Sequence, residues 1–156
     1  MAGKALALLS FPPLGPRRAS PRIFPADGAA PVSVRRSMAS VLLTTLLVLI
    51  NAARADVSVP PLAEDPVLQG RAQARAERMC AVGQFSHDGY QEAFRGSPYR
   101  RTGENLAMGH RDPRAIHRQL MSSPGHRANI LKRDFTALGV GMAPRCNLTV
   151  ELFGGR

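Results

Sequence analysis

The sequence predicts an α+β domain built in layers, because a series of capped helices precedes two alternating strands at the C-terminal end. Three helix starts share one signal, a side chain that can cap the helix followed by proline at the first helical position. These starts are Asp65-Pro66, Asp112-Pro113 and Ser123-Pro124. Residues 137–143 alternate large apolar with small side chains, and residues 148–153 alternate again, as expected of two antiparallel strands joined by a short turn.

Residues 1–37 differ in character from the rest of the 156-residue chain. They hold six of the thirteen prolines and two arginine pairs, and no apolar period runs through them. Such a segment buries too little surface to offset its ordering entropy, so we expect it to be disordered or to serve in targeting. Met38 offers an alternative start, which would leave 1–37 outside the protein. Residues 38–156 form the predicted domain, with enough chain for a modest core.

The apolar run over residues 41–50 has two interpretations. Arg35-Arg36 before it and Ala53-Arg54-Ala55 after it give it the form of a cleaved signal peptide. The same residues also predict a buried helix over 41–55, since few positions within it are polar. The two fates exclude each other. The run is about half the length that a bilayer requires, so a transmembrane helix is not expected.

The helix predicted over residues 65–82 carries one apolar face and ends at Gly83. Its apolar positions are Leu68, Ala72, Ala76, Met79 and Cys80. Three arginines are expected on a different, solvated face: Arg71, Arg75 and Arg78.

The elements between this helix and the final strands follow from turn and cap signals. They are a polar loop over 84–102, a short strand over 104–108, a helix opened by Asp112-Pro113 and a short helix over 124–131. The last of these places His126 in its first turn. Gly139 and Gly141 lack side chains, so we expect another element to pack closely on their face of the strand.

The net charge of +10 is shared equally between residues 1–37, with six basic and one acidic side chain, and the remainder. A nucleic-acid surface would cluster its bases and add stacking aromatic groups. Here the arginines are scattered and there is no Trp. The composition therefore indicates a solvated basic surface and no nucleic-acid partner.

Seven short motifs, in order, resemble the short bacterial branch of the CAP superfamily, also called SCP-like. They are Asn51-x-x-Arg54, Pro61-Leu62, Phe85-Ser86-His87, the run Gly103 to Ala107 (GENLA), the run Ser123 to Leu131 (SPGHRANIL), the run Phe135 to Gly141 (FTALGVG) and Phe153-Gly154. The match covers about residues 46–154. The resemblance implies an α–β–α sandwich with a small antiparallel sheet between helices, in a protein that is secreted or held at the cell envelope. It also favours 41–55 as a folded first helix, since cleavage after Ala55 would remove it.

The sequence departs from this pattern in three places. Leu120 stands where this branch has Trp, and residues 148–151 read LTVE where it has YWTQ. Ser123 stands in place of a second glutamate found in members with the full cavity. The loss of two aromatic side chains is expected to thin the core.

The resemblance places His87, Glu104 and His126 in one cavity. Two imidazoles and one carboxylate are suitable ligands for zinc or another divalent cation, and suitable groups for acid–base chemistry. The alternative is structural, with histidines bonded to a buried carboxylate that ties loops together. The sequence contains neither H-E-x-x-H nor G-x-S-x-G, so no protease or serine-hydrolase motif supports catalysis.

Four further residues accompany this cavity in the same motifs: Asn105, Ser123, Arg127 and Asn129. We expect the two asparagines to bond loop backbone and Arg127 to anchor the 123–131 segment, with anion binding as the alternative for Arg127. His110 and His117 are expected at the surface. Glu151 could line the rim of the cleft or face solvent, because strand alternation alone does not choose between the two faces.

Cys80 and Cys146 are the only cysteines. A disulfide between them is one possibility and would suit an exported protein. The other is a buried thiol at Cys80.

Together these observations predict a monomeric exported module that binds a cell-surface or extracellular ligand, with a lipid among the candidates. The alternative is a divalent-metal-dependent hydrolase that uses His87, Glu104 and His126.

Overall fold

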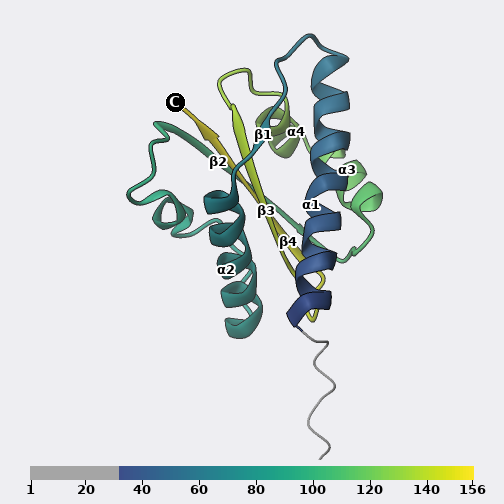
Figure 1. Cartoon of the computed structure of the whole chain (residues 1–156), viewed down its shortest axis with the longest axis vertical. Coiled ribbons are helices and arrows are strands. Elements are labelled where there is room, and N and C mark those ends of the chain that lie inside the picture. The colour runs from purple at the N-terminus through teal and green to yellow at the C-terminus, as the bar shows by residue number, and fades with distance from the viewer. Residues whose placement is uncertain (1–31) are drawn as a thin grey trace, which may run out of the picture. The chain divides into compact units, whose positions relative to one another are not determined.

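The computed structural model describes residues 32–156, with side chains from residue 40 onward. Within these residues, nine elements follow one another. They are α1 (Val32–Ala55), β1 (Ala63–Glu64), α2 (Pro66–Val82), a 3-10 helix (Tyr90–Phe94), β2 (Arg101–Met108), α3 (Pro113–Ser122), α4 (Pro124–Ile130), β3 (Ala137–Ala143) and β4 (Leu148–Gly155). Figure 1 shows α2 on one face of the sheet and α1 on the other, together with α3 and α4. The predicted α–β–α sandwich is confirmed.

The sheet has the strand order β1-β3-β4-β2, so β2 lies at one edge. β4 pairs antiparallel with both β3 and β2, as expected of the C-terminal hairpin. The two-residue β1 runs parallel to β3, which makes the sheet mixed rather than purely antiparallel. Because β2 is an edge strand, groups from both helical layers can meet around it.

The cap-and-proline signals mark real helix starts. The side chain of Asp65 accepts hydrogen bonds from the backbone N–H groups of Val67 and Leu68, at 2.8 and 2.9 Å. Asp112 caps α3 in the same way. Ser123 occupies the N-cap position of α4, but its side chain makes no capping bond. At this helix start the proline signal is therefore present without the side-chain cap.

The two glycines of β3 allow α2 to lie directly on the sheet. A Cβ atom at Gly139 would approach the backbone carbonyl carbon of Leu68 to 2.2 Å, and one at Gly141 would approach the backbone nitrogen of Gln73 to 2.2 Å. Backbone atoms cannot move aside as a flexible side chain can. The close approach expected from the sequence is confirmed.

Helix α1 is part of the core. Leu42, Leu43, Leu46 and Ile50 are at most 6% exposed. Arg54, near its end, is fully buried. Its guanidinium donates to four backbone carbonyls, those of Pro60, Ile130, Lys132 and Phe135, at 2.7 to 3.0 Å. The structure therefore matches the folded-helix interpretation.

α1 begins at Val32, which makes the end of the segment 1–37 helical rather than disordered. The expectation for residues 1–31 lies outside the described residues. Within residues 32–156, no helix combines the length and apolarity needed to cross a membrane.

Cys80 and Cys146, which are 66 positions apart in sequence, form a disulfide with Cα atoms 5.8 Å apart. The bond joins the end of α2 to the turn between β3 and β4. It resolves the choice that the sequence left open.

We expect the Cys80→Ala/Cys146→Ala variant to lose about 2–4 kcal/mol of unfolding free energy, because the bond restricts a long loop in the unfolded chain. Urea unfolding with and without a reducing agent measures this loss. The reducing agent should lower the stability of the wild-type protein and leave the double variant unchanged. Equal stability of oxidised and reduced wild-type protein would contradict the prediction.

Candidate functional site

The three predicted cavity residues meet around the edge strand β2. His87 comes from the loop after α2, Glu104 from β2 and His126 from the first turn of α4. The Nδ1 atom of His87 lies 2.9 Å from Oε1 of Glu104. The rings of His87 and His126 are tilted by 49°, with centroids 6.4 Å apart. The side chain of His87 is 56% exposed and that of Glu104 only 1%, so a buried carboxylate lies next to an accessible imidazole, with the half-buried His126 beside it.

A fourth residue, Arg75, binds the carboxylate from below. Arg75 is 4% exposed, and both its Nε and Nη2 atoms donate to Glu104, the latter at 3.1 Å. Nη2 also donates to the carbonyls of Ser86 and Asp88, at 3.1 and 3.2 Å. The expectation that Arg75 is solvated is wrong. It lies three residues after Ala72 and four before Met79, on the apolar face itself, and this spacing could have revealed it.

The arrangement of His87, Glu104 and His126 does not fit a divalent cation. Both carboxylate oxygens of Glu104 already accept hydrogen bonds from Arg75, and one of them also contacts His87. The buried guanidinium also adds a positive charge beside the carboxylate, which opposes a second cation. Among the described residues, no group of three or more His, Cys, Asp or Glu side chains is placed to hold a metal ion.

The two imidazoles differ in their surroundings. Burial lowers the pKa of His126, and the neighbouring His87 lowers it further. His126 is therefore mainly neutral at pH 7, with a ring that can donate or accept a hydrogen bond.

Two asparagines, one on β2 and one on α4, hold the site together. Asn105 Nδ2 donates to the carbonyl of His126 at 3.2 Å and to Oε2 of Glu151 at 3.1 Å. Asn129 Nδ2 donates to the carbonyl of Glu104 at 3.2 Å and to Oδ1 of Asn105 at 3.0 Å. These amides fix α4 against β2. Glu151 is fully buried, so it neither lines the rim of the cleft nor faces solvent.

The segment 123–131 is anchored by residues other than the one expected. Arg127 is exposed, and its guanidinium has no hydrogen-bond or ion-pair partner within the described part of the chain. Arg54 and the two asparagines hold the segment instead.

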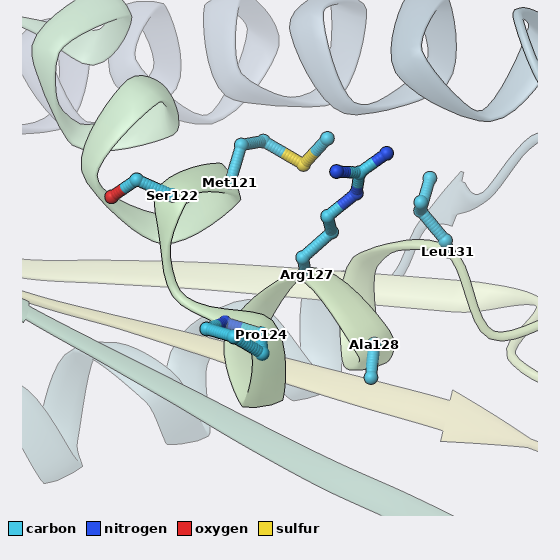
Figure 2. A pocket seen from close by; sticks show the side chains of 6 residues that line it. All are labelled: Met121, Ser122, Pro124, Arg127, Ala128 and Leu131. Carbon is cyan, nitrogen blue, oxygen red and sulfur yellow. The ribbon is translucent and has the colours of Figure 1, made fainter.

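A shallow pocket of about 360 Å³ lies beside α4. In Figure 2, Met121, Arg127 and Leu131 reach into it from the end of α3, from α4 and from the residue that follows α4. Ser122, Pro124 and Ala128 also line it. Ser123 lies next to this pocket in sequence and does not itself line it.

The two other histidines differ from each other. His110 is exposed, as expected, whereas His117 is half-buried. Burial lowers the pKa of His117.

A family model described as the cysteine-rich secretory protein family matches residues 47–153. The uncharacterised protein YkwD of Bacillus subtilis is 33% identical over an alignment of 118 residues, and the match covers 69% of this chain and 45% of that protein. The chain thus spans less than half the length of this relative.

Solved structures show the same fold. An extracellular SCP-domain protein of Bacillus anthracis is 28% identical with a TM-score of 0.68, over 72% of this chain and 40% of that one. An outer surface protein of Borrelia burgdorferi gives a TM-score of 0.67 at 20% identity, over 74% and 92% of the two chains. The first of these two neighbours is described as an extracellular protein and the second as an outer surface protein. The order of motifs, the sandwich and the matching model agree, and the chain belongs to the cysteine-rich secretory protein (CAP) family.

Proposed function

We propose that this chain is an exported CAP-domain protein that binds a partner at the cell surface or outside the cell through the face that carries His87 and His126. The Cys80–Cys146 disulfide supports export, since such bonds persist in oxidising compartments. The descriptions of the extracellular and outer-surface structural neighbours support it as well.

The observation that carries the proposal is the internal pairing of Glu104. Its carboxylate is 1% exposed and is bound by Arg75 and His87. A carboxylate engaged in this way ties α2, the loop after α2 and β2 together and is poorly available as a metal ligand or general base. The accessible groups are the exposed imidazole of His87 and the half-buried imidazole of His126, which can hydrogen-bond to a partner.

We expect the His87→Ala/His126→Ala variant to bind about tenfold more weakly to envelopes of the cells that produce the protein, as is usual when central interface residues are truncated. Binding of labelled protein to isolated envelopes measures this. His110→Ala is the matched control, because His110 is an exposed histidine outside the site. Equal binding by the double variant and the control would refute this face as the contact surface.

The proposed binding protein and the alternative hydrolase predict different affinities for zinc. If the chain is a binding protein, calorimetric titration with zinc should give the same weak binding for the wild-type protein and His126→Ala, because Arg75 already occupies Glu104. Tight binding that His126→Ala abolishes and His110→Ala leaves intact would instead support the metal-dependent enzyme.

A further inference from the structure

Glu151 is a fully buried acid in the middle of the sheet. It lies on β4, opposite Asn105 of β2 and Val140 of β3. Side chains two positions apart on a strand share a face, so Glu151 lies on the same face as Phe153, in the layer covered by α1, α3 and α4.

The carboxyl group of Glu151 has little polar support. Its one hydrogen-bond partner among the described residues is the amide of Asn105, which donates to Oε2. Oε1 has no partner there. The hydroxyl of Thr149, two residues earlier on the same face, likewise has none in this part of the chain. A buried carboxylate ion with a single hydrogen-bond donor is costly, whereas a neutral acid loses less when it leaves water.

The titratable and charged groups on the surrounding elements do not offset a charge on Glu151. They are His126 and Arg127 on α4, His117 with Arg114 and Arg118 on α3, and Arg54 on α1; the facing positions of β2 and β3 are the uncharged Asn105 and Val140. Arg54 is engaged by backbone carbonyls. Within the described residues, no Lys, Arg or His forms an ion pair with Glu151.

Burial therefore disfavours the ionised form. It raises the pKa of Glu151 to about 7, against a smaller lowering by the Asn105 hydrogen bond. The group is thus poised to change charge within a physiological pH range.

Asn105 connects this acid to the candidate site. Its amide group has two hydrogens, and its Nδ2 atom donates both to Glu151 and to the carbonyl of His126. Its oxygen accepts from Asn129, which also binds the carbonyl of Glu104. A change at Glu151 is therefore two hydrogen bonds away from the backbone of His126.

We propose that Glu151 is a proton-responsive positioning residue: as a neutral acid it leaves Asn105 holding the first turn of α4, and as an ion it pulls the Asn105 amide toward itself and loosens the turn that carries His126. The ionised form makes the stronger, charge-assisted bond to the amide and draws in water, which competes for the remaining bond to His126. This device goes beyond the proposed function and does not depend on which partner binds.

The direction of the pH effect follows from proton linkage. The folded protein keeps the Glu151 proton at pH values where the unfolded chain, with an ordinary glutamate pKa of 4.5, has lost it. Stability conferred by this group is therefore present at low pH and declines as the pH rises from about 4.5 to about 7. The unfolding equilibrium constant should rise by up to about tenfold per pH unit in this window.

Urea unfolding of the wild-type protein and Glu151→Gln between pH 4 and 8 tests the linkage. Gln has the shape of the protonated acid and cannot ionise, so the variant should lack this decline. Glu64→Gln, a change at an exposed glutamate, should keep it. Parallel profiles for wild type and Glu151→Gln would overturn the proposal.

A direct measurement does not depend on the variant folding. The carboxyl ¹³C signal of Glu151 in wild-type protein should titrate with a midpoint near 7, and the carbonyl ¹³C signal of His126 should shift with the same midpoint. The ring of His126 titrates at lower pH, and that second transition should remain in Glu151→Gln while the first disappears. A titration midpoint of Glu151 near 4.5 would contradict the proposal that this side chain is a neutral acid in the folded protein. A His126 carbonyl signal that does not shift with the Glu151 midpoint would contradict the positioning role.

Discussion

A chain that begins at Asp56 is expected not to fold. It lacks Leu42, Leu43, Leu46 and Ile50, which are buried in the core. Each such side chain contributes about 1.5–3 kcal/mol on burial, so the loss is about 6–12 kcal/mol. A domain of this size is stable by only about 5–15 kcal/mol. The shortened chain also lacks Arg54, so the carbonyls of Ile130, Lys132 and Phe135 lose their buried donor.

Chains that begin at Val32, Met38 and Asp56 allow the comparison. Near-ultraviolet circular dichroism and urea unfolding should show cooperative transitions for the first two and none for the third. Val48→Ala in the full chain is a control, because Val48 is an apolar residue of α1 that is 63% exposed, and it should change stability by less than about 0.5 kcal/mol. A cooperative transition in the Asp56 chain would show that α1 is dispensable.

The same result bears on export. If α1 is essential, cleavage after Ala55 and the native fold exclude each other, and any processing site must lie before Leu42, the first residue of α1 that the structure describes as buried. N-terminal sequencing of the exported protein checks this point. A mature N-terminus at Asp56 on a folded protein would contradict the role of α1 as a core helix.

Local signals were enough to predict most of the fold. Asp65 and Asp112 indicate helix starts, because their side chains bond to backbone N–H groups two or three residues further along the chain. Gly139 and Gly141 indicate close packing, because they have no side chain. The two-residue strand β1 carried no such signal. It forms because the chain after α1 passes beside β3, where the backbone of Ala63 donates to Thr136 and that of Asp65 donates to Leu138, and tertiary contacts of this kind leave no periodicity in the sequence.

The site was less predictable from the residues themselves. His87, Glu104 and His126 could be grouped through the family resemblance, since nothing in their local sequence indicates that they meet. Strand alternation left Glu151 undecided because helices cover both faces of this sheet, so both alternatives were in fact interior. Arg75 was assigned to solvent because arginine is rarely buried, although its spacing placed it on the apolar face. Its partner Glu104, distant in sequence, makes that burial tolerable.

The buried pair of Arg75 and Glu104 is expected to contribute strongly to stability. Arg75→Met should cost about 3–5 kcal/mol, because it leaves a buried carboxylate without its charge partner. The double variant Arg75→Met/Glu104→Leu should recover much of this loss, since no charge then remains buried. Urea unfolding of both variants at pH 7 measures the difference. Arg78→Met is the matched control on the same helix, because Arg78 is exposed, and should change stability by less than about 0.5 kcal/mol.

The same variants test why the site does not fit a metal ion. If the guanidinium of Arg75 occupies the carboxylate in place of a cation, Arg75→Met should bind zinc more tightly than the wild-type protein, and Arg75→Met/Glu104→Leu should not. The added cation would also restore part of the lost stability, because it binds the folded state alone. A stability cost below about 1 kcal/mol, together with unchanged zinc affinity, would mean that Glu104 does not depend on Arg75. The Arg75–Glu104 pair would then not explain why the Glu104 carboxylate fails to bind a cation.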